Sequence, residues 1–364
     1  MTGSSLYSCF DFRLSSEIPL PELATAGAGD SRPVVPVRLA ALPETLAGGR
    51  SVGAGLEVAG EEAMLTIAET ARYLVRDGRE ILVEPAPGGS PRNLRLFLLG
   101  SALGILCHQR GLLALHANGV VAGDRAFAFA GPSGAGKSSL AAYFAAAGHE
   151  ILGDDVCAIA FEDGRPFAWP GLPRLKLWGD TLEAFARERG ALEPAVEGMD
   201  KYHVPLADPA QPRPISFRRL YILSRAQAGA ETAIRRLRGR EAMDAVLAQT
   251  YRGQYLAPLG LSADHFRRCA MLLAHAEVYE ASRAWGYERH PGDADRPDRP
   301  VYLADRRRSF PCNPRRAWLW RGPAFFVAKG LADAGERSGR ERWWTGLDSN
   351  QRRGNPGRFT VCCL

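Results

Sequence analysis

Lysine is scarce in this sequence of 364 residues, where lysine and arginine together number 46. The only lysines are Lys137, Lys176, Lys201 and Lys329. Arginine is therefore the default cation, and a lysine that falls in a functional pattern is more informative than usual.

Cysteine patterns typical of metal or disulfide proteins are also missing. The seven cysteines form no CxxC pair, and no Cys/His cluster has zinc-ligand spacing. This excludes the zinc-finger and disulfide-scaffold classes. An odd number of scattered cysteines in a large chain favours a reducing compartment.

Long apolar runs are absent as well. The longest, residues 96–107, contains Gly and Ser and is too short to span a bilayer. Residues 1–10 lack a basic region followed by an apolar stretch, so we expect no secretory signal. With 46% hydrophobic and 24% charged residues, the chain has an ordinary globular composition. We expect a soluble, cytoplasmic protein with no membrane partner.

The net charge of +6 is concentrated at one end of the chain. Residues 286–364 carry 16 basic and 9 acidic side chains, a net of +7, which leaves residues 1–285 with −1. The body shows neither helix-turn-helix spacing nor a basic face, so no nucleic-acid partner is expected. Residues 291–364, rich in Arg, Pro and Gly, are predicted to form a poorly ordered tail.

The length suggests two domains, and the pattern changes near residue 92. Residues 1–92 are predicted to form a small β-rich domain, with a hairpin over 73–83 that turns at Asp77-Gly78. Residues 93–290 begin with a helix over 93–109 and continue as an α/β domain. Its first strands are expected at 112–116, 119–122, 126–130 and 150–153, with a helix at 138–147. Further strands are expected at 156–161, 166–169, 216–224, 232–237 and 276–284, and helices at 181–189, 240–250 and 262–275.

A glycine-rich loop lies between the strand at 126–130 and the helix at 138–147. Gly131-Pro-Ser-Gly-Ala-Gly-Lys-Ser138 fits the phosphate-loop pattern, with the strand before it and the helix after it that this pattern requires. Its glycines let backbone N–H groups converge on an anion at the helix N-terminus. The predicted phosphate-binding residues are Gly131, Ser133, Gly134, Ala135, Gly136, Lys137, Ser138 and Ser139.

An acidic pair follows the next strand. Asp154-Asp155 comes at the carboxyl end of the strand at 150–153, where α/β sheets bind ligands. One carboxylate is expected to contact Mg²⁺ and the other to accept a proton, and the pattern alone does not assign either role to a particular residue. His116 ends an apolar strand, and on this evidence alone a structural role is the better interpretation.

Three segments together resemble the catalytic domain of HPr kinase/phosphorylase: 116–121, the loop at 131–138, and 151–155. That family phosphorylates a protein serine, and its P-loop fold is related to phosphoenolpyruvate carboxykinase. The resemblance implies that Lys137 and Ser138 bind nucleotide phosphates and Mg²⁺. It implies that Asp154 is the base for the acceptor serine, that Asp155 is a Mg²⁺ partner, and that His116 supports this pair in the active site.

Over residues 1–290 the chain is similar to HPr-kinase-like serine kinases of peptide-modification gene clusters, including lasso-peptide clusters. The segments at 173–178 and 20–23 carry this likeness. The chain departs from true HPr kinases at Pro132, where an acidic residue is usual, and in lacking their Arg-rich signature. Lys176 and Lys201 are candidates for the missing cations, with surface lysines as the alternative.

The sequence thus predicts a serine kinase that uses ATP, or another nucleoside triphosphate, and Mg²⁺. Its acceptor is a serine of a peptide or protein, with a ribosomal precursor peptide as one candidate. Three alternatives stay open: an HPr kinase/phosphorylase, a nucleotide-binding regulator without transfer activity, and a small-molecule kinase. A homo-oligomer also stays open.

Overall fold

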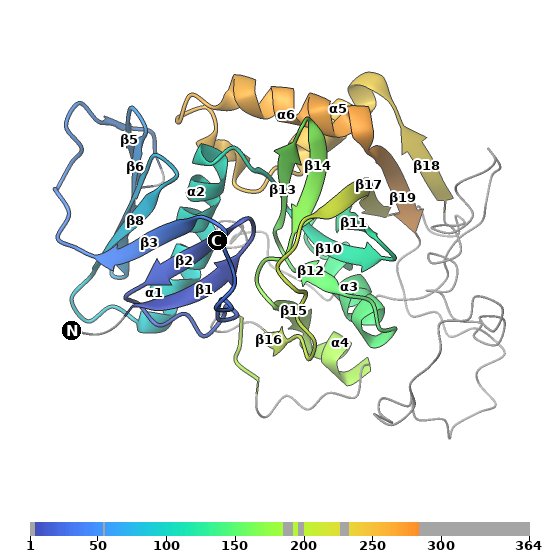
Figure 1. The fold of residues 1–364 in the computed structure, drawn as a ribbon, viewed down its shortest axis with the longest axis horizontal. Coiled ribbons are helices and arrows are strands. Elements are labelled where there is room, and N and C mark those ends of the chain that lie inside the picture. Colours follow the sequence, from blue (N-terminus) through green and yellow to red (C-terminus); the bar gives the residue numbers. More distant parts are fainter. Residues whose placement is uncertain (1–3, 54, 185–191, 196–199, 226–232, 284–364) are drawn as a thin grey trace, which may run out of the picture.

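The computed structural model describes residues 4–53, 55–184, 192–195, 200–225 and 233–283. The predicted tail at 291–364, and the part of the predicted helix at 181–189 beyond residue 184, lie outside these residues. Within them the chain is mixed α/β, with an eight-stranded, a nine-stranded and a two-stranded sheet (Figure 1). No helix in the described part of the chain is long and apolar enough to cross a membrane.

The N-terminal region is β-rich, as predicted. Its sheet has the strand order β1-β2-β3-β8-β7-β6-β5-β4. The predicted hairpin is β7 and β8, and Asp77 and Gly78 take the left-handed φ values of 55° and 63° that its turn requires. The strands are β1 (Ser5–Cys9), β2 (Phe12–Ser16), β3 (Val34–Leu39), β4 (Arg50–Ser51), β5 (Leu56–Ala59), β6 (Glu62–Ile67), β7 (Ala71–Arg76) and β8 (Glu80–Pro85).

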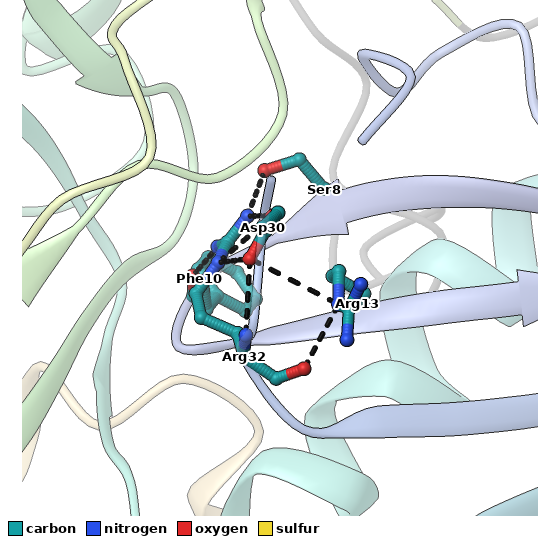
Figure 2. A network of polar contacts seen from close by, with 5 residues as sticks. All are labelled: Ser8, Phe10, Arg13, Asp30 and Arg32. Carbon is teal, nitrogen blue, oxygen red and sulfur yellow. Dashed lines mark hydrogen bonds and ion pairs between the residues drawn. The ribbon is translucent and has the colours of Figure 1, made fainter. Parts of the chain in front are cut away.

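A polar network fixes the turn between β1 and β2. The guanidinium of Arg32 is ion-paired with Asp30 and donates to the Ser8 hydroxyl at 2.7 Å and to the Phe10 carbonyl (Figure 2). Arg13 donates to the carbonyl of Arg32 at 2.8 Å. These contacts hold Phe10 in a left-handed conformation, with φ 50°.

The same turn anchors the N-terminal sheet to the rest of the molecule. The Phe10 N–H donates to the carbonyl of Pro170 at 2.9 Å. A Cβ atom on Gly171 would lie 2.5 Å from the Phe10 ring, so only glycine permits this approach. The contact falls just before β15 (Arg174–Trp178), which contributes to the site described below.

A long helix joins the two larger sheets. It comprises α1 (Pro91–Phe97), a π-helical turn η1 (Leu98–Ala102) and α2 (Leu103–Gln109). The start is set by Ser90, whose hydroxyl accepts from the N–H of Asn93, with Pro91 in the first turn. The helix predicted over 93–109 is thus present, but the π-helical turn η1 interrupts its α-helical hydrogen bonding. Buried residues of this helix share one apolar core with the N-terminal sheet and with Ala114 and Ala158 of the second sheet.

The nine-stranded sheet runs β12-β10-β11-β17-β14-β13-β9, with β19 beside β17 and β18 beside β19. The order differs from the simple strand–helix–strand unit expected from the sequence, because β10 lies between β11 and β12 and is antiparallel to both. The strands are β9 (Leu113–Leu115), β10 (Ala117–Ala122), β11 (Arg125–Ala130), β12 (Ile151–Gly153), β13 (Cys157–Glu162), β14 (Arg165–Trp169), β17 (Ile215–Arg225), β18 (Ala233–Leu237) and β19 (Glu277–Arg283).

Helices cover both faces of this sheet (Figure 1). On one face, Phe127 and Phe129 of β11 pack against Phe144 of α3 (Lys137–Ala146). On the other, the small side chains Ala126, Ala128 and Ala130 share a core with α5 (Gly239–Ala248) and α6 (Ser262–His275). Strand alternation thus divides β11 into an aromatic and a small-residue face. The other elements are β16 (Lys201–Pro205), which pairs with β15, α4 (Gly179–Ala184) and the short η2 (Gly253–Tyr255).

A buried histidine on α6 makes the fold sensitive to acid. His265 is 3% exposed, and its Nε2 lies 2.8 Å from the Thr250 hydroxyl. Burial, with a further contribution from His108, lowers its pKa from 6.5 to about 4. The unfolded chain binds this proton at a higher pH than the folded chain does. The contribution of His265 to the free energy of unfolding is therefore fully present above about pH 6.5 and is lost as the pH drops towards the folded-state pKa.

We expect His265→Gln to flatten this acid dependence. Between about pH 7.5 and about pH 5, wild type should lose about 2 kcal/mol more of its free energy of unfolding than the variant. Urea denaturation at the two pH values measures the difference. His275→Gln, at an exposed position of the same helix, is the control and should keep the wild-type slope. Equal slopes for all three proteins would show that His265 is not responsible.

Candidate functional site

The glycine-rich loop joins β11 to α3 with a backbone that only glycine adopts freely. Gly131, Gly134 and Gly136 have φ values of 141°, 79° and 78°. Gly136 is the N-cap of α3, and no side chain caps the helix there. The first-turn N–H groups of the helix therefore remain available to an anion.

Lys137 lies over the start of this loop. Its ammonium donates to the carbonyls of Gly131 at 2.8 Å and Pro132 at 3.2 Å, and the residue is only 7% exposed. Burial lowers the pKa of Lys137, and the charges of Asp155 and Asp154 oppose that shift. A positive charge is thus held where the loop would place phosphate oxygens.

Asp154 is hydrogen-bonded to the loop serine. Its Oδ1 accepts from the Ser138 hydroxyl at 3.1 Å and from the N–H of Asp155 at 3.0 Å. Its Oδ2 accepts from the backbone N–H of Lys176 at 2.6 Å. Burial, and then the neighbouring charge of Asp155, raise the pKa of Asp154 to about 6.

Asp155 points to a different partner. Its Oδ2 lies 2.5 Å from the ammonium of Lys176 on β15, and both side chains keep some exposure, 22% and 25%. Burial favours the neutral acid, but the Lys176 charge outweighs it and holds the pKa of Asp155 below its usual range. The backbone of Asp155 is left-handed, with φ 69°. Lys176 is thus a site cation. The Lys201 ammonium lies 5.6 Å from the centroid of the Trp178 ring, and its charge also lowers the pKa of both aspartates.

His116 follows β9 and lies at the same site. Its backbone N–H donates to the backbone carbonyl of Gln249 at 2.7 Å, and its ring stacks on the ring of Tyr251, with the two centroids 6.1 Å apart. Burial, and then the charge of Lys137, lower the pKa of His116 to about 4, so its imidazole is neutral near pH 7. Among the described residues no hydrogen bond joins its ring to the acidic pair.

The site has components that the sequence analysis did not find. Gln249, just after α5, accepts the N–H of Gly131 on its Oε1 at 3.0 Å, so one residue contacts both the loop and His116. The Tyr251 N–H donates to Ala114 of β9 at 2.9 Å. These residues lie more than a hundred positions after the loop in the sequence. A local spacing pattern therefore does not connect them with it.

A cavity of about 550 Å³ collects several of these groups. It is lined by the start of the loop, His116, both aspartates and Lys176, together with apolar residues of the joining helix. Of the predicted phosphate-binding residues, only Gly131 and Ser133 line this cavity. Gly134, Gly136, Lys137 and Ser138 are not among its lining residues. Ala135 is buried in the core beneath α3, and Ser139 contacts Thr181 at 3.2 Å. The lining comprises Leu96, Phe97, Leu99, Gly100, His116, Gly131, Pro132, Ser133, Asp154, Asp155, Val156, Leu172, Arg174, Lys176, Ala248, Gln249, Thr250, Tyr251, Arg252 and Gln254.

The donor set at this site fits Mg²⁺ better than a transition metal. No group of three or more His, Cys, Asp or Glu able to hold a metal occurs in the described part of the chain. Mg²⁺ in phosphoryl-transfer sites needs fewer protein ligands, because one or two carboxylates and the substrate phosphates complete its shell. Ser138 with Asp154, 3.1 Å apart beside the loop, meets that requirement.

The Gln249 contact gives a testable effect on the loop. Gln249→Met keeps the side-chain length but leaves the Gly131 N–H without its acceptor. We expect the nucleotide Kd to rise about tenfold, because without this contact the start of the loop is held less rigidly in the conformation that binds phosphate. Calorimetric titration measures it. In the matched control, Gln109→Met removes the same kind of acceptor from Gly78, at 2.9 Å and away from the loop. A loss of affinity equal to the control's would exclude a specific role for Gln249.

Comparison with known proteins adds little to this geometry. No protein-family model matches the chain, and no curated protein matches it. Among solved structures, the chain is similar to the HPr(Ser) kinase/phosphatase from Coxiella burnetii. The match has 12% sequence identity, covers 47% of this chain and 85% of that chain, and has a TM-score of 0.24. A TM-score of 0.24 is too low to support a shared fold or function, so the function is inferred from the site itself.

Proposed function

We propose that the protein is a nucleotide- and Mg²⁺-dependent serine kinase, with a P-loop fold of the HPr kinase type. The observation that supports this most strongly is the contact between the loop hydroxyl of Ser138 and the carboxylate of Asp154. It joins the predicted phosphate-binding loop to an acidic pair that lines the cavity. A glycine-rich turn without a ligand has no need of this arrangement.

Each group has a role in this reaction. The loop N–H groups and the Lys137 ammonium bind the triphosphate and stabilise the charge on the transferring group. Ser138 and the acidic pair hold Mg²⁺, which when bound neutralises phosphate charge. One carboxylate of the pair accepts the acceptor's proton. His116, stacked on Tyr251, borders the cavity as a neutral group.

The acceptor in this proposal is a serine of a peptide or protein, including a ribosomal precursor peptide of the lasso type. We place the enzyme in the cytoplasm, which agrees with four free, buried cysteines among the described residues. ATP is the proposed donor.

A library of serine-containing peptides incubated with Mg²⁺-ATP tests the proposal. We expect phosphoserine in a subset of peptides, detected by mass spectrometry, and no product when EDTA removes the metal. Nucleotide binding without phosphorylation of any peptide would instead favour the regulator alternative. Phosphorylation of free serine or another small molecule, but of no peptide, would favour a small-molecule kinase.

A further inference from the structure

We infer that Asn118 is a positioning residue of the Mg²⁺ and nucleotide site, and that its buried amide acts through Asp154, as a hydrogen-bond donor to the carboxylate that holds the metal ion. The inference rests on the proposed function and deepens it at the metal site. The contacts described so far leave Asn118 without a role.

Asn118, on β10, is a fully buried polar residue. Its exposed fraction is 0%, and neither its Oδ1 nor its Nδ2 has a hydrogen-bond partner among the described residues. No other described side chain has two buried polar atoms in this condition. Buried polar groups in folded proteins are nearly always hydrogen-bonded, because an unpaired one destabilises the fold. Stability alone would therefore favour an apolar residue at this position.

The side chain of Asn118 projects to the face of the sheet that α3 covers. Asn118 pairs with Phe129 of β11, and directly opposed residues of antiparallel strands project to the same face. The Phe129 ring stacks on the ring of Phe144 in α3, with the two centroids 5.5 Å apart. Val120, two residues further along β10, belongs to the same core as Phe144. The amide is thus buried on the α3 side of β10.

Asn118 and Asp154 occupy adjacent positions on neighbouring strands. Gly119 pairs with Gly153 across β10 and β12, and Asn118 and Asp154 are the next residues along the two strands on the side of the loop. Asp154 also lies on the α3 side, because its Oδ1 accepts from Ser138 in the first turn of that helix. Residues opposed across two strands have Cβ atoms about 5 Å apart. At that separation a change of rotamer brings an amide and a carboxylate into hydrogen-bond contact.

Asp154 depends on its hydrogen-bond donors to hold a cation. A carboxylate that binds a metal is itself fixed by neighbouring donors, and loss of one such partner lowers metal affinity about 10- to 100-fold. The donors that now contact Asp154 are the N–H groups of Asp155 and Lys176 and the Ser138 hydroxyl. The hydroxyl has a second task, because it is the Mg²⁺ ligand of a phosphate loop. The Asn118 amide supplies a donor that has no other partner and adds no charge.

Two substitutions of one shape separate this role from a structural one. In Asn118→Val, the Kd for ATP with Mg²⁺ should rise about tenfold, while the Kd in EDTA changes less than about threefold. Without nucleotide, this variant should melt about 2 to 4 °C above wild type, because an apolar group replaces an unpaired amide. Asn118→Thr has the shape of valine with a hydroxyl, and it should bind Mg²⁺-ATP at least about threefold more tightly than Asn118→Val. Calorimetry and thermal melting measure these effects.

Smaller side chains and a neighbouring position provide the controls. Asn118→Ala and Asn118→Ser repeat the comparison with side chains that fit in the space of asparagine, and the serine variant should bind Mg²⁺-ATP more tightly than the alanine variant. Val120→Thr adds a hydroxyl at the next position of β10 on the α3 side. It should lower the melting temperature and leave the effect of Mg²⁺ on the ATP Kd unchanged.

The outcomes distinguish the inference from the proposed function. Wild-type affinity for Mg²⁺-ATP in both Asn118→Val and Asn118→Ala would overturn the inference and leave the proposed function intact. A lower melting temperature in Asn118→Val with unchanged affinity would also overturn it, because the amide would then serve the core alone. If wild type binds ATP equally well with Mg²⁺ and with EDTA, the proposed function itself fails at its metal site.

Discussion

Replacement of Lys137 by Ala should raise the Kd for Mg²⁺-ATP by about 10- to 100-fold. The ammonium is held by two loop carbonyls and is the only side-chain cation that the structure places inside the loop among the described residues. Phosphate oxygens would exchange these carbonyl contacts for charge-assisted ones. Calorimetry with ATP and Mg²⁺ measures the change.

Lys137→Met is the matched variant for this prediction. It keeps the apolar stem within its buried position and removes only the charge. We expect it to lose as much affinity as Lys137→Ala, with a thermal melting temperature closer to wild type. Unchanged nucleotide affinity in both variants would exclude Gly131–Ser138 as the phosphate-binding loop.

Ser138→Ala should uncouple nucleotide binding from the metal. Wild type is expected to bind ATP more tightly as Mg²⁺ is added, because the Ser138 hydroxyl and Asp154 together hold the ion. In the variant this dependence should shrink about tenfold, and phosphoryl transfer should fall about 100-fold.

Ser138→Thr provides the rescue control, since threonine keeps the hydroxyl that phosphate loops use. It should restore most of the Mg²⁺ dependence. The same loss in both variants would contradict a specific role for the hydroxyl, because threonine retains it.

Local chemistry explains which parts of the fold could be predicted. The helix after the loop was expected at 138–147 and spans Lys137–Ala146, because glycines fix its start and Gly148 follows its end. The turn at Asp77-Gly78 was equally predictable, since left-handed φ values favour these residue types. Such features are set by residues adjacent in the sequence, so the residue types alone are enough to predict them.

Long-range pairing explains what the sequence did not show. The antiparallel β10 between β11 and β12 depends on register across the sheet, and both arrangements produce the same alternation of apolar residues. The contacts of Gln249 with Gly131 and His116 join segments far apart in the chain. The different partners of the two aspartates follow from the left-handed turn at Asp155, which no spacing rule marks.

The most direct test of the proposed reaction counts products in one mixture. Wild-type protein, Mg²⁺, ATP and a serine peptide from the library are combined, and ADP and phosphoserine are quantified together over time. We predict that the two products form in equal amounts, and that both nearly vanish when the acceptor serine is replaced by alanine. ADP that forms at the same rate without an acceptor serine, or nucleotide that binds without either product, would contradict a serine kinase.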